Sequence, residues 1–333
     1  MTTTMRRAPA LPSPRGPISE AVLSVLRGNR TGPPDVGGSP PYGEDLQLAL
    51  YCCYELHYRG FGEVDTEREW DPALLTIRAG LERVFLGALR EDVPPGSDVE
   101  GELDALLVEH VDAPGVSRYL SRDGEPWQLR EYVAHRSLYH LKEADPQTFV
   151  IPRLDGPCKA ALVTVQHDEY GAGDPERAHA RLFADMMTEL GLSEAYGAYL
   201  DSAPAETLAE VNFMSLCGLH RGLRAMLIGQ FATVELTSSP GSDRMVKAMR
   251  RLGCGPAAIR FYAEHVEADA VHEQLLRREV IAPLLTAEPA LAPDIVFGIR
   301  SSVFLAARSE ERLLRHWNRG ESSLRDGVEA GRP

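Results

Sequence analysis

The chain has 333 residues, a formal net charge of −14 at pH 7 and a hydrophobic share of 44%. This length suffices for one large core or two smaller domains, and the composition is that of an ordinary globular protein. The acidic balance argues against a nucleic-acid partner, because phosphate binding depends on clustered Lys and Arg. No uninterrupted apolar stretch approaches the roughly 20 residues of a bilayer span, so we expect no membrane insertion.

The cysteines predict a reducing, cytoplasmic location. Cys52 and Cys53 are adjacent and cannot close a relaxed disulfide, and the other three cysteines stand alone. No apolar run follows Arg6 and Arg7, so we expect no secretion signal.

The apolar pattern predicts an all-α fold. Residues 1–40 are rich in Pro, Gly, Ser and Thr and predict a disordered leader, and residues 320–333 predict a flexible tail. Between them apolar residues recur at spacings of three and four, with no series of strands. Helices are predicted at 43–60, 72–92, 99–110, 126–145, 158–170, 175–190, 204–237, 243–252, 256–280 and 289–317.

Several residues predict helix ends. Pro256 predicts a helix start, Asp174 predicts the N-cap of a helix that begins at Pro175, and Asp145 before a proline predicts a helix end. Because no internal repeat or linker interrupts the pattern, we expect an N-terminal helical annex over 41–125 and one helical-bundle core over 126–319.

The strongest chemical signal lies in the predicted helix 256–280. His265, Asp269 and His272 are spaced i, i+4 and i+7 and therefore share one face of that helix, where apolar residues are otherwise expected. Burying three ionisable groups without partners would cost several kcal/mol. A divalent metal would neutralise them, and the alternatives are a hydrogen-bonded polar core or a stripe that faces solvent.

Other helices offer matching groups. Glu235 ends an apolar run, Glu169 follows the segment ALVTV, and His179 lies in the next helix. Glu143 follows His140 by one turn. Carboxylates and imidazoles without Cys suit iron or manganese better than structural zinc, and four acids would balance two ferrous ions.

The sequence resembles the haem-oxygenase-like di-iron oxidases and oxygenases, often described as iron-containing redox enzymes. The resemblance covers most of residues 126–310 and rests on KEADP at 142–146, the run DEYGAGDPERAH at 168–179, the acid at 235 and the triplet at 265, 269 and 272. It implies a haem-oxygenase-like helical bundle. The metal ligands that it implies are Glu143, Glu169, His179, Glu235, His265, Asp269 and His272.

The resemblance also implies cofactors, partners and a reaction. We expect two Fe(II) ions, with manganese as the alternative metal, and O2 as co-substrate. The expected partners are a small-molecule substrate and an external electron donor or reductase, and the chain could form a homodimer. The extra carboxylate at 143 favours N-oxygenation of an amino-containing metabolite. Oxidative desaturation, decarboxylation or C–C cleavage of an amino or fatty acid is the alternative, and a metal-free helical ligand-binding protein is the non-enzymatic one.

Several polar, aromatic and basic residues lie outside the predicted ligand set. Glu55 and His57 are two apart on a helix, so we expect one to be buried and the other exposed. His135 and His140, and likewise His167 and Asp168, are read as surface or supporting groups. Trp70, Trp127 and Trp317 are read as packing residues. The basic residues with apolar neighbours that could hold a substrate carboxylate are Arg59, Arg136 and Arg153.

Overall fold

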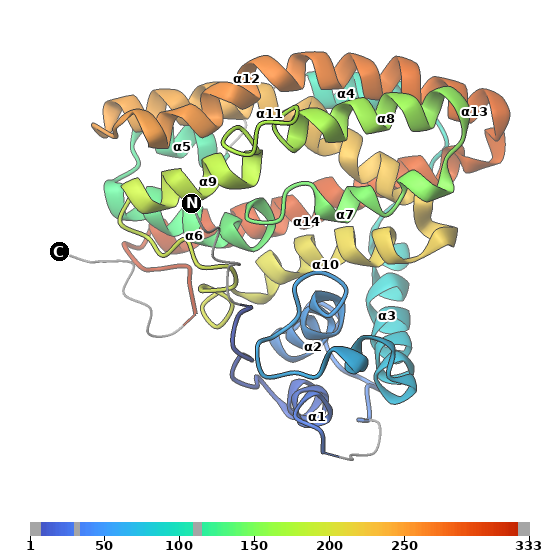
Figure 1. The fold of residues 1–333 in the computed structure, drawn as a ribbon. Coiled ribbons are helices and arrows are strands. Elements are labelled where there is room, and N and C mark those ends of the chain that lie inside the picture. The colour runs from blue at the N-terminus through green and yellow to red at the C-terminus, as the bar shows by residue number, and fades with distance from the viewer. Residues whose placement is uncertain (1–7, 30–33, 109–114, 326–333) are drawn as a thin grey trace.

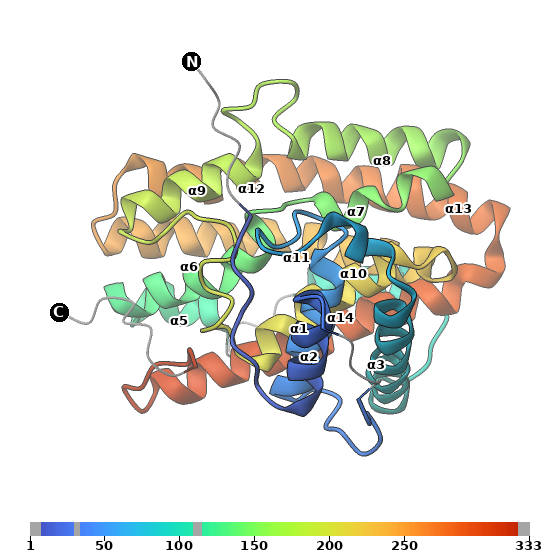
Figure 2. The same cartoon turned by 60° about the horizontal axis from the view of Figure 1, so that its bottom comes forward.

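The computed structural model describes residues 8–29, 34–108 and 115–325. Within these ranges the regular elements are helices and no strand is present, which confirms the all-α prediction. From here on, the annex means α1 (Pro17–Leu26), α2 (Glu44–Glu55) and α3 (Pro72–Asp92), so it begins and ends earlier than the predicted annex over 41–125. Figures 1 and 2 show these three helices together on one side of the bundle, with α2 against α10.

The other described helices form the bundle, which Figure 1 shows above the annex. Its α-helices are α4 (Val99–Leu107), α5 (Val116–Arg122), α6 (Pro126–His140), α7 (Asp145–Thr148), α8 (Gly156–Glu169), α9 (His179–Glu189), α10 (Ala205–Leu219), α11 (Arg224–Arg251), α12 (Pro256–Leu275), α13 (Ala282–Ala287) and α14 (Ala292–Trp317). Short 3-10 turns cover Thr66–Trp70, Ile151–Arg153, Arg221–Leu223 and Pro289–Leu291, and a π-helical turn covers Leu276–Ile281.

The prediction of a disordered leader is wrong for the described residues before 40. Pro17 opens α1, and Val22 and Leu23 on this helix are fully buried. The backbone N–H groups of Ile18 and Ser19 donate to the carboxylate of Asp45, at 2.9 and 2.7 Å. A short apolar helix among Pro and Gly is therefore held by tertiary contacts that composition does not reveal. The rest of that prediction, at 1–7 and 30–33, lies outside the described residues.

The tail prediction is also wrong for residues 321–325. Ser323 is buried against α6, where its backbone N–H and hydroxyl both donate to Glu131. Its hydroxyl also lies 2.9 Å from His135 Nε2. This segment is therefore ordered by side-chain hydrogen bonds, and residues 326–333 lie outside the described part of the chain.

Two predicted helix boundaries in the C-terminal half are wrong. The expected helix 204–237 is two helices, because the chain turns at His220 and Gly222. The expected break before 243 is absent, since α11 continues through Pro240. Pro240 is exposed, and the helix continues although the missing N–H removes one of its hydrogen bonds.

Two further boundaries next to the predicted ligands are wrong, whereas Pro256 does open α12 as predicted. Asp174 accepts an N–H from Glu176 in a turn, and α9 begins only at His179. Asp145 begins the short helix α7 instead of ending a long one, because α6 already ends at His140. Residues 141–144 therefore form a non-helical turn.

The larger apolar core is continuous from the annex into the bundle. Leu48 and Leu50 of α2 belong to the same cluster as Leu208 of α10 and Ile299 of α14. A smaller cluster includes Phe183 of α9. Of the tryptophans, Trp317 is buried and Trp127 packs at the edge of the smaller cluster, whereas the packing role predicted for Trp70 is wrong, since 66% of that residue is exposed.

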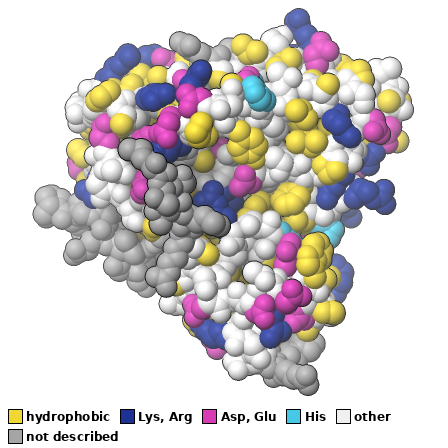
Figure 3. Space-filling model, in the orientation of Figure 1, with side chains coloured by type: hydrophobic (Ala, Val, Ile, Leu, Met, Phe, Trp, Pro, Cys, Tyr) yellow, Lys and Arg dark blue, Asp and Glu magenta, His cyan; other side chains and the backbone are white. Residues whose placement is uncertain are grey.

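The segment Pro289–Trp317, which contains α14, is long and apolar enough to cross a membrane by length and composition alone. It packs against α10 and α11, and core helices of soluble proteins pass the same test. Figure 3 shows acidic and basic side chains interspersed over one face of the described molecule.

Candidate metal centre

Six of the seven predicted ligands come together inside the bundle. They arrive from the turn before α7, the end of α8, the start of α9, the middle of α11 and the length of α12. All six side chains are buried, and they are Glu143, Glu169, His179, Glu235, His265 and His272.

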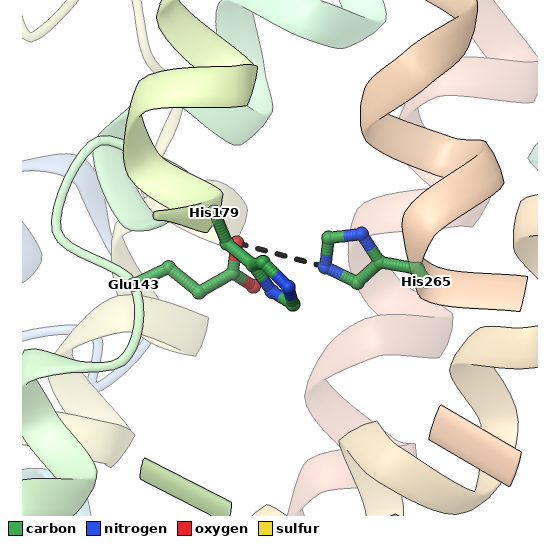
Figure 4. Close-up of side chains that lie close together, drawn as sticks. All are labelled: Glu143, His179 and His265. Atoms are coloured by element: carbon green, nitrogen blue, oxygen red, sulfur yellow. Dashed lines mark ion pairs between the residues drawn. The ribbon is translucent and has the colours of Figure 1, made fainter. Parts of the chain in front are cut away.

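The first group consists of Glu143, His179 and His265. One ligand atom of each lies within 4.8 Å of the others. Figure 4 shows the three side chains converging from three separate segments, with Glu143 Oε2 3.8 Å from His265 Nε2. The imidazole rings of His179 and His265 are 4.3 Å apart at their centroids. This group presents one carboxylate and two imidazoles to a common point.

The second group consists of Glu169, Glu235 and His272, whose ligand atoms also lie within 4.8 Å of one another. His272 Nδ1 is 3.1 Å from Glu235 Oε2 and 3.4 Å from Glu169 Oε1. Glu169 also connects the two groups, because its Oε2 is 2.9 Å from Nδ1 of His179. The two groups therefore adjoin, with Glu169 at their boundary.

Asp269 lies on α12 between His265 and His272 in the chain. Its side chain lies outside the described part of the structure. Its role as a ligand therefore stays a prediction.

The orientation of each α12 imidazole has an identifiable cause. The Nδ1–H of His265 donates to the carbonyl oxygen of Phe261 at 2.7 Å, which leaves Nε2 toward Glu143. Nε2 of His272 lies 3.4 Å from Asp168 Oδ2, with Nδ1 toward Glu169 and Glu235. Hydrogen bonds of this kind fix which nitrogen of a histidine can bind a metal.

The pKa directions suit a metal site. Burial lowers the pKa of His265 to about 4, so its ring is neutral, as a ligand requires. Burial also raises the pKa of Glu143 to about 7. Burial opposes ionisation of Glu169 as well, but neighbouring imidazoles, chiefly His179, outweigh it and hold the pKa of Glu169 below its ordinary value.

The site gathers several buried carboxylates. Glu143, Glu169 and Glu235 are three acids within one enclosed volume, and isolated burial of such groups is costly. Divalent cations with oxygen and imidazole preferences, such as iron or manganese, fit this donor set.

A cavity of about 330 Å³ opens beside the predicted ligands and is lined by Glu143, Glu169, Glu235 and His265. Sequence reasoning missed most of its other polar lining, which includes Tyr132, Glu210, Arg244 and Tyr262. These residues are far apart in the chain, and only the packing of α6, α10, α11 and α12 brings them to one cavity.

Of the three arginines proposed to hold a substrate, only Arg136 lines this cavity. Its Nη1 is 3.3 Å from Glu210, and its Nε donates to His140 Nε2 at 3.3 Å. The guanidinium groups of Arg59 and Arg153 instead donate to backbone carbonyl oxygens, so their role is structural.

His140 is buried and its Nδ1 lies 2.8 Å from Glu143 Oε1, as a supporting group would. Burial holds the pKa of His140 well below its usual value. Because Nε2 accepts from Arg136, the neutral imidazole carries its proton on Nδ1.

The expectation that one of Glu55 and His57 is exposed is wrong. Glu55 is buried, and the side chain of His57 is enclosed by its bond to Glu69 and its contact with Arg78. The helix that places Glu55 ends at this residue, so the two groups do not alternate between helix faces.

Comparison with known proteins gives one informative match. No curated protein matches the chain. A family model described as iron-containing redox enzyme matches residues 130–307, which include every predicted ligand. The match covers more than half of the chain and agrees with the helical fold and the buried carboxylate and imidazole groups. The chain therefore belongs to the family of iron-containing redox enzymes, as its resemblance predicts.

Proposed function

We propose that the chain is a non-haem di-iron oxygenase or oxidase that uses O2 to oxidise a small amino-containing metabolite. The observation that carries this proposal is the pair of adjoining ligand groups, each with at least one buried carboxylate and one imidazole. Family membership supports the iron and the redox chemistry. Two ions, rather than one, match two groups that meet at Glu169.

In this proposal each group holds one iron ion. Glu143, His179 and His265 hold the first, and Glu235 and His272 hold the second, with Glu169 able to reach both. When bound, reduced iron would supply the electrons and open coordination positions that O2 activation needs. The protein fixes the ligand nitrogens through Phe261 and Asp168 and encloses the reaction within buried side chains.

The cavity supports a small polar substrate. Arg136 lines the same cavity as Glu143, and its guanidinium group can form two parallel hydrogen bonds with a carboxylate. It would bind the carboxylate of a substrate and give up its 3.3 Å hydrogen bond to Glu210. An amino group on the same substrate would then lie toward the carboxylates. This arrangement favours N-oxygenation, with desaturation, decarboxylation or C–C cleavage as the alternative outcome for the same bound molecule.

Oxygen uptake tests this function. Chain loaded with Fe(II) under anaerobic conditions, supplied with a chemical reductant, should consume O2 faster when a free amino acid or small amine is added, and long fatty acids should have no effect. Arg136→Met should raise KM for a carboxylate-bearing substrate about tenfold or more, since a charged hydrogen bond contributes about 1.5–3 kcal/mol.

Arg181→Met is the matched control, because Arg181 lies on the surface of α9 away from the cavity lining. Stimulation by fatty acids alone would replace N-oxygenation with oxidative decarboxylation. Absence of any iron-dependent O2 uptake would favour the metal-free ligand-binding alternative.

A further inference from the structure

The turn between α6 and α7 connects the metal centre to the annex. Its two central residues have side chains in opposite environments: Glu143 joins His179 and His265, whereas Lys142 forms an ion pair with Glu55 at the end of α2. The turn has no helical ladder of its own. Short-range backbone hydrogen bonds link its residues to the end of α6 and to one another, among them Lys142 N–H to Tyr139 and Asp145 N–H to Lys142, both 2.8 Å, so the side chains of the turn must be oriented by other contacts.

Lys142 is enclosed on the annex side. Its side chain and that of Glu55 are each only 1% exposed, and Nζ lies 3.0 Å from Glu55 Oε2. The ammonium group also lies 4.0 Å from the ring centroid of Tyr58 and 5.1 Å from that of Tyr51. A flexible lysine side chain is thus held in one position by an acid and two aromatic faces.

Glu55 is held in turn by other groups. The hydroxyl of Tyr196 donates to its Oε2 at 2.8 Å, and the backbone N–H of Arg59 approaches its Oε1 at 3.3 Å. The Arg59 guanidinium lies over the Tyr196 ring and donates to the carbonyl oxygen of Leu141 at 2.8 Å. The annex therefore holds two consecutive residues of the turn, 141 and 142.

A fully buried ion pair is weak evidence for stability, because desolvation of both charges offsets their attraction. An apolar pair of similar volume would pack as well. The charged pair instead fixes the direction of the Lys142 side chain, because Nζ must point at the Glu55 carboxylate. Lys142 is the residue before Glu143, a predicted ligand. Glu55 and Arg59 also lie outside residues 130–307, where the family model matches.

We propose that Glu55, Arg59 and Lys142 form an annex clamp that positions the Glu143 carboxylate in the metal centre. They are positioning residues, and the inference rests on the proposed two-iron site. Because Glu143 belongs to only one of the two ligand groups, loss of the clamp weakens one iron site and spares the other.

The test measures Fe(II) binding and stability separately in the full chain. Fe(II) is titrated anaerobically against a chromogenic chelator, and thermal unfolding is followed on the same samples. Lys142→Met should raise the Kd of one iron site about tenfold or more, as loss of supporting contacts around a metal ligand does. The double variant Glu55→Gln/Lys142→Met removes both charges at similar volume, so stability should recover while the weakened iron site persists.

Asn212→Leu is the matched control. Asn212 of α10 donates to the backbone and side-chain oxygens of Gln47 on α2, both at 2.8 Å, and so joins the annex to the bundle without touching the turn. It should lower thermal stability and leave both iron sites unchanged.

The outcomes separate the clamp from the metal centre. If the double variant binds two iron ions with unchanged Kd, or if Asn212→Leu loses iron in proportion to its lost stability, the clamp is refuted while the two-iron proposal stands. If the unmodified chain itself binds no iron, the metal centre is refuted and the clamp falls with it.

Discussion

Single residues decide whether the centre can bind metal, and His272 is the most informative of them. It is buried, and its Nδ1 lies near both Glu169 and Glu235. His272→Ala opens a coordination position without removing a large apolar side chain. We therefore expect iron per chain to fall to one or fewer, O2-dependent activity to be lost and far-ultraviolet circular dichroism to stay unchanged.

The neighbouring exposed histidine gives the control for this variant. The side chain of His167 is 61% exposed, so His167→Ala should retain iron. Global unfolding of His272→Ala would instead assign that histidine a structural role.

A second residue-scale prediction concerns acid stability. His135 is buried between Thr207 and Ser323, and burial lowers its pKa from 6.5 to about 3. As the pH falls, His135 is protonated near pH 6.5 in the unfolded chain but only near pH 3 in the folded one. The contribution of neutral His135 to the free energy of unfolding is therefore complete above pH 6.5 and is lost as the pH falls toward 3. The free energy of unfolding should therefore fall by up to about 1.4 kcal/mol per pH unit from this group.

His135→Gln removes the titrating group and keeps a hydrogen-bonding side chain. Urea unfolding between pH 7 and 4 should show a shallower pH dependence for this variant than for the unmodified chain. Identical slopes would contradict burial of a neutral His135.

The convergence of several predicted ligands could be anticipated at this scale because their spacing carries the information. His265 and His272 are seven residues apart, which is about two turns of an α-helix, so the sequence alone places them on one helix face. Both belong to the buried ligand groups in the structure. Arg136 could not be separated from Arg59 and Arg153 in the same way. All three have apolar neighbours in the chain, and only the tertiary structure shows which of them faces a cavity and which donate to backbone carbonyl oxygens.

At the scale of elements, α11 and α14 pack unusually closely. A Cβ on Gly298 would collide with the carbonyl oxygen of Met226, and one on Gly229 with that of Ile295. Because backbone cannot yield as a flexible side chain can, Gly298→Ala should lower the free energy of unfolding by about 1–3 kcal/mol. α11 also carries Glu235, so iron affinity should fall too.

Gly87→Ala is the comparison for this substitution, since no atom within 4 Å would meet a Cβ at that position of α3. It should be neutral or stabilise by about 0.5–1 kcal/mol, the helix preference of Ala over Gly. Equal effects of the two substitutions in chemical denaturation would contradict the close α11–α14 contact.

One long helix was predicted to the residue, whereas elements that depend on remote partners were not predicted. The predicted helix 72–92 has the same bounds as α3, and its N-cap acid Asp71 precedes a proline at the first helical position. In contrast, α1 depends on Asp45 of another helix, and the turn 141–144 depends on the annex. Neither partner is adjacent in the sequence, so local pattern carries no signal for them.

For the whole molecule, the continuous core predicts cooperative unfolding. Leu48 of α2 and Ile299 of α14 lie in one apolar cluster, so the annex and the bundle share buried surface. Differential scanning calorimetry of the metal-free chain should show a single transition whose calorimetric and van't Hoff enthalpies agree. Two resolved transitions would mean that the annex folds as a separate domain.

The most direct test of the central claim is anaerobic loading of the full chain with ⁵⁷Fe(II), followed by iron quantification and Mössbauer spectroscopy before and after exposure to O2. Two adjoining groups of buried carboxylates and imidazoles predict two ferrous ions per chain, in nitrogen and oxygen coordination, that are oxidised together by O2. Binding of a single ion per chain, or iron that is not oxidised by O2, would contradict the account.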